Sequence, residues 1–162
     1  MSVEAVKAYL SALGQANRIV EHATTSDTVE HAAQVCGCRP EEIVKTLSFL
    51  VGDRAVLICA AGDAKVNGSR FKAHFGEKAV MIPRERVEEL TGHAPGGVCP
   101  FACREGTQVY LDVSIQRFAQ VHAAAGSGNS TIALTPEELL DWSRAAGWVD
   151  VCKGWQSDEE AG

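Results

Sequence analysis

The stretch Ala94–Cys103, APGGVCPFAC, concentrates two glycines, two prolines and two cysteines in ten residues. Two kinds of chemistry suit such a loop. Cys99 and Cys103 could bind a metal ion through their thiolates. Alternatively, Gly96 and Gly97 could let a ligand approach main-chain N–H groups, because glycine has no side chain to block that approach. The rest of the sequence has to decide between these two interpretations.

The spacing of the other cysteines favours free thiols over a metal site. Cys36 and Cys38 are separated by one residue, which is tighter than the two to four residues between paired ligands of most zinc sites. Cys59 lies in the apolar run AVLICAA and is typical of a small buried hydrophobic residue. The chain also lacks a thioredoxin-like Cys-x-x-Cys motif. We therefore expect six thiols, no bound metal and no cofactor.

Lys45 is a candidate for a functional charge, because it directly precedes the apolar stretch TLSFL and an ammonium group is rarely fully buried. Its side chain could extend from a strand edge into water, or it could point into a pocket. The chain contains neither the Gly-x-Ser-x-Gly elbow of α/β-hydrolases nor the zinc-deaminase signature. The five histidines are scattered, as surface or hydrogen-bonded side chains would be.

A second glycine cluster, AGSGN at 125–129, offers another site of close backbone approach. Successive N–H groups in such a segment can form a nest that binds an oxyanion or a phosphate. The same composition is equally typical of a hairpin turn. On its own, this cluster does not distinguish a ligand loop from a turn.

The elements that would position these residues follow from hydrophobic periodicity and from capping residues. Helices are predicted over 3–13, 27–36, 68–76, 83–92 and 137–147, and a helical turn over 40–46. Asp27 is the expected cap of the second helix, and the stretch from Thr135 to Glu138 is the expected cap of the last. Strands are predicted over 17–23, 47–52, 55–62, 78–82, 107–113, 118–125 and 130–135. This order indicates one α+β domain, with a mixed and mostly antiparallel sheet flanked by helices, rather than a regular βαβ repeat.

Composition and charge limit the classes of function. The 162 residues suit a single domain over 1–155, followed by an acidic, flexible tail at 156–162. No segment approaches a membrane span, and we expect a cytoplasmic protein without a signal peptide. The net charge of −6 argues against general binding to polyanions, but residues 65–86 hold six cations and two anions. That basic window is either a solvated surface or a contact for a polyanion.

Several stretches, in this order, resemble the YbaK/EbsC family of free-standing aminoacyl-tRNA deacylases, which are similar to the editing insertion domain of bacterial prolyl-tRNA synthetase. They are VKTLSFLV with Lys45, TGHAPGGVCPF, VYLDVS, AAGSGN and IALTPEELL. The resemblance extends from about Ala5 to Leu140. Its most specific part is GGVCPF, where Gly96 and Pro100 occupy the family's Gly-x-x-x-Pro positions. The resemblance thus favours a substrate loop over a metal site at 94–103.

The resemblance also implies roles for individual residues. The catalytic set would be Lys45 with the N–H groups of Gly96 and Gly97, which would hold the developing oxyanion. The amino-acid pocket would be formed by Thr46, Val98, Pro100, Asp112, Gly126, Ser127 and Asn129. The basic window would meet the acceptor stem through Lys65, Arg70 and Lys72, because phosphate contacts position a nucleic acid without reading its sequence.

The implied function is hydrolysis, in trans, of mischarged aminoacyl-tRNA. The substrate would be tRNA-Pro carrying Cys, Ala or another small amino acid, and prolyl-tRNA synthetase is a candidate partner of a monomer or homodimer. Two other hypotheses stay open on the sequence alone. One is a catalytically idle module of the same fold that binds a tRNA end or a synthetase. The other is a thiol or metal protein.

Overall fold

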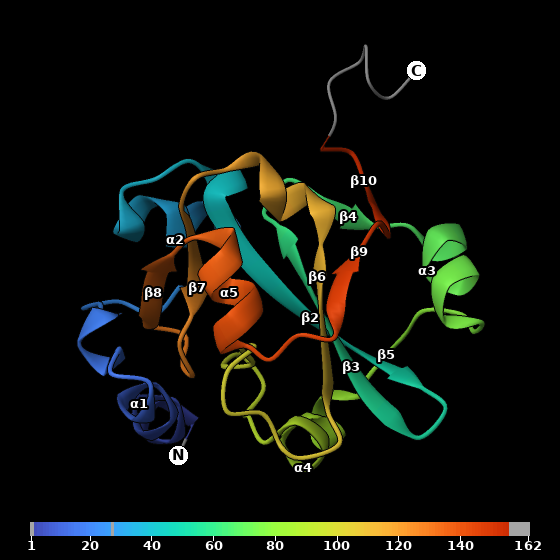
Figure 1. The fold of residues 1–162 in the computed structure, drawn as a ribbon, viewed down its shortest axis with the longest axis horizontal. Coiled ribbons are helices and arrows are strands. Elements are labelled where there is room, and N and C mark those ends of the chain that lie inside the picture. Colours follow the sequence, from blue (N-terminus) through green and yellow to red (C-terminus); the bar gives the residue numbers. More distant parts are fainter. Residues whose placement is uncertain (1, 27, 156–162) are drawn as a thin grey trace.

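An eight-stranded mixed sheet organises the computed structural model, which describes residues 2–26 and 28–155 (Figure 1). Its strands lie in the order β1-β8-β7-β2-β3-β6-β9, and β5 pairs with β2 beside this path. The pairs β2–β7, β3–β6 and β6–β9 are parallel, and the others in the sheet are antiparallel. The prediction of an α+β fold with a mixed, mostly antiparallel sheet is therefore confirmed.

The strands of this sheet are short except for the central hairpin. They are β1 (Ile19–Glu21), β2 (Ile43–Val51), β3 (Arg54–Ala61), β5 (Val80–Met81), β6 (Gln108–Asp112), β7 (Val121–Ala124), β8 (Ser130–Leu134) and β9 (Gly147–Val149). A separate ribbon pairs β4 (Lys65–Val66) with β10 (Cys152–Lys153). The β2–β3 hairpin turns at Gly52, whose φ of 62° suits the first central position of a two-residue loop.

Helices connect these strands and cover the sheet. The α-helices in the described part of the chain are α1 (Ser2–Ala12), α2 (Val29–Cys36), α3 (Gly68–Phe75), α4 (Val87–Thr91) and α5 (Pro136–Trp142). Short 3₁₀ turns cover Ala16–Arg18, Pro40–Glu42, Arg84–Arg86 and Val113–Arg117. The start of α5 is capped as the sequence predicts, because Thr135 and Glu138 each bond to the other's backbone N–H.

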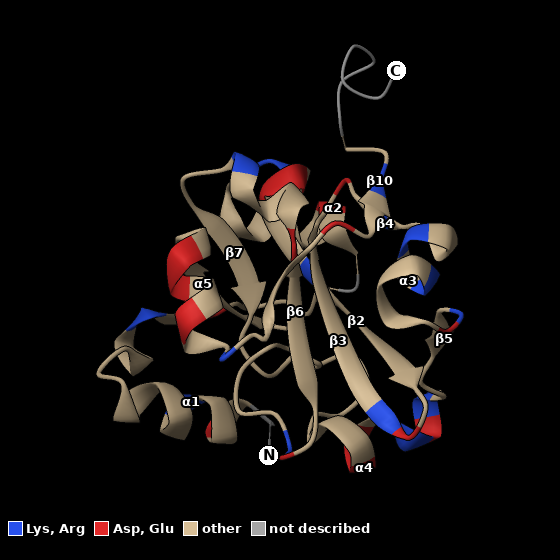
Figure 2. Cartoon of the chain, turned by 45° about the vertical axis from the view of Figure 1, so that its right-hand side comes forward, with Lys and Arg blue, Asp and Glu red and all other residues tan. Residues whose placement is uncertain are grey.

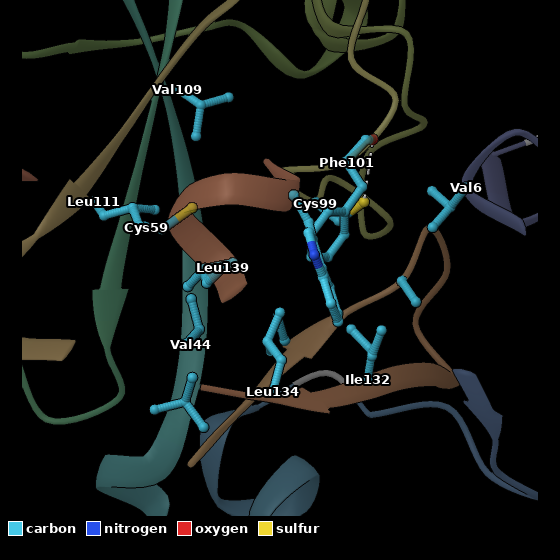
Figure 3. Close-up of a cluster of buried hydrophobic side chains, with 14 of the residues drawn as sticks. Val6, Val44, Cys59, Cys99, Phe101, Val109, Leu111, Ile132, Leu134 and Leu139 are labelled. Carbon is cyan, nitrogen blue, oxygen red and sulfur yellow. Dashed lines mark hydrogen bonds between the residues drawn. The ribbon is translucent and has the colours of Figure 1, made fainter. Parts of the chain in front are cut away.

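Two buried clusters lie on opposite faces of the sheet, because side chains alternate along β3. Leu57 and Cys59 of β3 belong to the first cluster, which α1 and α5 cover and which Figure 3 shows in part. Ile58 and Ala60 belong to the second cluster, which Phe71 of α3 covers. The central strand is thus buried on both faces and gives the neighbouring site a rigid support.

Most predicted elements are present, but some boundaries and segments were wrong. The helical turn at Pro40 ends at Glu42, so that Lys45 lies inside β2 and not in a helical turn. The last helix ends at Trp142, and Arg144 then takes a left-handed φ of 55° before the unpredicted strands β9 and β10. Thr28 accepts from the N–H of His31 as the cap of α2, while Asp27 and the tail at 156–162 lie outside the described residues.

None of the helices in the described part of the chain is both long and apolar enough to span a bilayer.

Candidate active site

A gap in strand pairing opens along the outer edge of β2. On this side β2 pairs with β7 at Ile43 and Val44 and with β5 at Phe49 and Leu50, and no described strand pairs with the residues between. The N–H of Ile82 donates to the carbonyl of Ser48 at 3.1 Å, which shows that the Ser48 main chain faces the gap. Because main-chain direction alternates along a strand, the N–H and C=O of Thr46 face it as well.

A pocket of about 450 Å³ occupies this gap. Its walls come from α2, from residues 43–48 of β2, from β5 and the segment up to Val87, from β7 and β8, and from two loops around Gly96 and Ser127. Residues far apart in the sequence therefore meet at the unpaired edge of β2. Pockets of this volume suit a small organic group rather than a protein segment.

Positive charge dominates the ionisable lining of the pocket. Lys45 and Arg84 line it together with His122, and the described lining contains no Asp or Glu. None of the ion pairs found among the described residues involves Lys45 or Arg84. In a chain with a net charge of −6, this local excess favours an anionic or polarised ligand.

Lys45 lies at the edge of β2 and is half-buried. Alternation places its side chain on the second-cluster face, and its partner across the hairpin, Ala60, belongs to that cluster. Burial lowers the pKa of the Lys45 ammonium, and the nearby charge of Asp63 acts in the opposite direction. Lys45 is thus a partly desolvated charge, held between the pocket and the second cluster.

Thr46 points to the opposite face of β2. Its hydroxyl lies 3.7 Å from the sulfur of Cys59, its partner across the hairpin. Lys45 and Thr46 both line the pocket because the pocket follows the unpaired strand edge and so reaches both faces.

The loop at 94–98 begins with a tight turn whose geometry changes the predicted set of donors. The N–H of Gly97 donates to the carbonyl of Ala94 at 2.9 Å, and Gly96 has a φ of 88°. Proline at the second position and a left-handed glycine at the third are typical of a type II turn. The prediction that the N–H of Gly97 faces substrate is therefore wrong, because the turn itself uses that group.

Two other N–H groups of this loop have no acceptor among the described residues. They belong to Gly96 and Val98, and both residues line the pocket. Gly97 instead contacts the second loop: a Cβ atom on it would lie 2.9 Å from the carbonyl oxygen of Gly126. Its lack of a side chain is thus required by close packing of the two loops.

Side chains lock the second loop in place. Ser127 lines the pocket, whereas Gly126 is buried behind it with a φ of 104°. Nδ2 of Asn129 donates to the main-chain carbonyl of His22 at 3.1 Å, and the main-chain carbonyl of Asn129 accepts from the N–H of His22 at 2.7 Å. Asn129 therefore holds the loop against the segment before α2 and is not part of the pocket lining.

Asp112 has a structural position, contrary to the role that the resemblance implied. It is fully buried outside the pocket lining, where its carboxylate accepts from the N–H of Ser114 at 3.0 Å and from the N–H of Val151 at 2.9 Å. These bonds fix the end of β6 and the segment before β10. Pro100 is likewise buried outside the lining, so that it does not contact the pocket directly.

The three predicted tRNA contacts differ in their availability. Lys65 and Lys72 are exposed and take part in none of the ion pairs found among the described residues. Arg70 bonds to the carboxylate of Asp150 at 3.3 Å and to the carbonyl of Cys152 at 2.6 Å. Figure 2 shows the positive residues of α3 beside β4 and β10. Arg70 therefore ties α3 to this ribbon, and only the two lysines stay candidate phosphate contacts.

Sequence reasoning missed Arg84 and His122. Arg84 was one of the six cations of the basic window, and nothing in the sequence separated it from the others. His122 lies between the buried Val121 and Ala123, and this alternation could have indicated that it faces the other side of β7. Burial lowers the pKa of the His122 imidazole, and the nearby carboxylate of Glu42 acts in the opposite direction. The lowered pKa favours the neutral form of this imidazole in the pocket wall.

Cys99 and Cys103, in the loop at 94–103, are free thiols in the structure. Cys99 is fully buried, burial raises its thiol pKa, and the Cys103 sulfur donates to its carbonyl at 3.3 Å. Within the described residues, no three His, Cys, Asp or Glu side chains gather as a metal site would require.

We predict that replacing both Cys99 and Cys103 with Ser leaves activity per folded molecule within a few-fold of wild type. Neither sulfur contacts the pocket, so that the main cost should be a buried hydroxyl and a lower melting temperature. Elemental analysis of the wild-type protein should find far less than one zinc per chain. One zinc per chain that the double variant loses would contradict this interpretation of the loop.

Comparison with known proteins finds a matching family model and similar sequences. The model of the aminoacyl-tRNA editing domain family matches residues 23–142, which include Lys45 and both loops. The chain is 45% identical over 157 residues to the uncharacterized protein YwhH of Bacillus subtilis (strain 168), with 96% of this chain and 100% of that protein covered. It is 27% identical over 110 residues to the proline–tRNA ligase of Bacillus licheniformis, covering 67% of this chain and 19% of the ligase.

A solved structure resembles the whole fold. It is described as "Crystal structure of a putative trans-editing enzyme for prolyl tRNA synthetase" and is 30% identical to this chain. The superposition covers 94% of this chain and 98% of that one, with a TM-score of 0.85. Because the family model matches well over half of the sequence and includes the lining of the pocket, the chain belongs to the aminoacyl-tRNA editing domain family.

Proposed function

We propose that this protein hydrolyses the ester bond of mischarged aminoacyl-tRNA in trans, and that its substrate is tRNA-Pro carrying Cys, Ala or another small amino acid. The observation that carries the proposal is the pocket at the gap in β2. There Lys45, the free N–H groups of Gly96 and Val98, and Ser127 line a single space. Membership of the editing domain family, and similarity to part of proline–tRNA ligases, support the choice of ester and of tRNA.

The chemistry needs few protein groups, because an aminoacyl ester is already activated. In the proposed step, water adds to the ester carbonyl, the bond to the ribose oxygen breaks, and the ribose hydroxyl leaves with a proton from that water. The N–H groups of Gly96 and Val98 would stabilise the oxyanion that develops on the carbonyl oxygen. Lys45 would bind a polar group of the terminal nucleotide and keep the ester in place.

The lining also suits a small amino acid. Ile82, Val87 and Val98 provide apolar walls on the side of α4, and the remaining lining is rich in hydroxyl groups. A side chain of a few atoms occupies only part of this volume and leaves room for the ester and part of the terminal nucleotide. The loops can then stay packed against one another at Gly97 and Gly126.

A panel of charged tRNAs tests the proposal. We expect enzyme in excess to release Cys or Ala from tRNA-Pro in a single turnover, and to release correctly attached proline far more slowly. Prolyl-tRNA synthetase can be added to the same assay to test whether it acts as a partner. Tight tRNA binding without release of any amino acid would contradict the proposal and favour an idle binding module.

We further predict that Arg84→Gln weakens the use of tRNA substrate. Arg84 lines the pocket, whose described lining contains no Asp or Glu, so that it is placed to meet a phosphate near the tRNA end. We expect KM to rise about tenfold, and the slope of log KM against log salt to fall by about one, as for loss of one phosphate contact.

Arg86→Gln is the matched control for this prediction. Arg86 lies in the same 3₁₀ turn, but its Nε atom bonds to Glu89 at 3.0 Å and it is outside the pocket. Its loss should change KM and the salt slope little. Equal effects of the two substitutions would show that only the overall charge of the turn matters.

A further inference from the structure

A chain of side-chain hydrogen bonds crosses the second loop. The hydroxyl of Ser127 lies 2.8 Å from Oδ1 of Asn129 and 2.7 Å from the hydroxyl of Ser130. At the other end of the chain, Nδ2 of Asn129 donates to the carbonyl of His22. Ser127 and Ser130 line the pocket, and Ser130 is only 1% exposed.

The direction of each bond in this chain is determined by donor and acceptor types. The carbonyl of His22 can only accept, so that the amide nitrogen of Asn129 faces it and Oδ1 faces Ser127. Oδ1 can only accept, so that Ser127 gives it its single hydroxyl proton. Ser130 must then donate to Ser127, because that proton is already used.

This fixed direction leaves the pocket wall without a donor at these two side chains. Ser127 keeps one lone pair and Ser130 keeps two, since a hydroxyl oxygen has two acceptor sites. No described donor other than Ser130 bonds to either oxygen. The wall therefore matches a ligand group that carries N–H donors, and it mismatches a group that carries only acceptors.

The acceptor wall adjoins the loop that we assign to the ester carbonyl. A Cβ atom on Gly97 would lie 3.4 Å from Cα of Ser127, and one on Gly128 would lie 3.7 Å from the carbonyl oxygen of Gly96. In an aminoacyl ester, the α-amino group is attached one carbon from the carbonyl. An ester held by the N–H of Gly96 thus presents its α-amino group within the neighbourhood of Ser127.

We propose that Ser127, backed by Ser130, binds the α-amino group of the aminoacyl ester, so that the pocket selects esters of free amino acids. This inference rests on the proposed function and names a further subsite within it. The subsite needs no carboxylate, because hydroxyl oxygens accept from a neutral amine as well as from an ammonium group. Asn129 acts as a positioning residue: its Oδ1 accepts the hydrogen bond from the Ser127 hydroxyl, which would otherwise be free to donate into the pocket.

Two substrates and one substitution test this subsite. Alanyl-tRNA-Pro and propionyl-tRNA-Pro differ only by the amine, and each is assayed in a single turnover with wild type and with Ser127→Ala. We expect the substitution to slow release of alanine about tenfold, as for loss of one or two hydrogen bonds, and to leave propionyl release unchanged. The comparison of two enzymes on each ester cancels the intrinsic difference in ester reactivity.

The possible outcomes separate this inference from the proposed function. An equal loss on both esters, or no loss on alanyl-tRNA, would overturn the α-amino subsite while leaving the hydrolase intact. No release of any amino acid from the panel by the wild-type enzyme would overturn both. If the enzyme releases Cys rather than Ala, cysteinyl-tRNA-Pro and its analogue without the amine replace the alanyl pair, with the same expected outcomes. If Ser127→Ala does not fold, Ser127→Cys replaces it, because it keeps the size of the side chain but offers only a weak acceptor.

Discussion

Replacing Lys45 with alanine is expected to slow single-turnover deacylation by about a hundredfold, because Lys45 keeps the ester in place and a misplacement of about 1 Å costs about 10² in rate. Lys45 lines the pocket, carries no ion pair within the described residues and is half-buried. Burial lowers its pKa, which means that the fold disfavours the ammonium group. A charge held at such a cost is expected to serve the ligand rather than the stability of the protein.

Stability measurements on the same variants separate these two roles. Lys45→Met keeps the apolar stem and removes the charge, so that we expect its melting temperature to equal or exceed that of wild type while activity is lost. Lys78→Ala, at an exposed lysine outside the pocket, should change neither quantity. A Lys45→Ala enzyme with a near-normal rate would contradict the assignment.

The pKa of Lys45 also predicts how the rate depends on pH. Because burial lowers this pKa, a step that needs the ammonium should be active below the lowered pKa and lost as the pH rises through it. That loss should come at a lower pH than for an ordinary lysine. The arginine of Lys45→Arg keeps its charge over this pH range. Any residual activity of this variant, after spontaneous hydrolysis is subtracted, should therefore not fall at high pH.

Local patterns predicted the elements of the fold well. The Thr135–Glu138 capping box and the continuous apolar run of β3 both depend on residues close in sequence. The strands β9 and β10 were missed because each is short and pairs only with distant partners. Periodicity could not predict that Lys45, Gly96 and Ser127, which are far apart in the sequence, line one site. The resemblance to the editing domain predicted this.

The site itself could be predicted only in part. Lys45, Thr46, Gly96, Val98 and Ser127 do line one pocket. The gap in β2 depends on where β5 and β7 stop pairing, which no stretch of sequence specifies alone. Asp112 and the N–H of Gly97 were assigned to substrate, but both form hydrogen bonds within the protein. Residue type alone does not reveal which polar groups are used in this way.

Gly97→Val is expected to reduce the rate of the chemical step by about a hundredfold or more. A Cβ atom at this position would lie 2.9 Å from the carbonyl oxygen of Gly126 and 3.4 Å from Cα of Ser127, and both are backbone atoms that cannot rotate away. One loop must therefore move, and a shift of about 1 Å near reacting groups costs about 10² in rate. The rate per folded molecule and the melting temperature are measured on the same sample.

Gly97→Val should affect the stability of the protein less than it affects the rate. Overpacking costs about 1–3 kcal/mol, which lowers the melting temperature of a domain of this size by only several degrees. Gly68→Val is the matched control, because a Cβ atom there meets nothing within 4 Å and no left-handed φ is involved. It should keep its rate. If Gly97→Val is destabilised but fully active, contact between the two loops serves the fold alone, and the donors at Gly96 and Val98 lose their assignment to the ester.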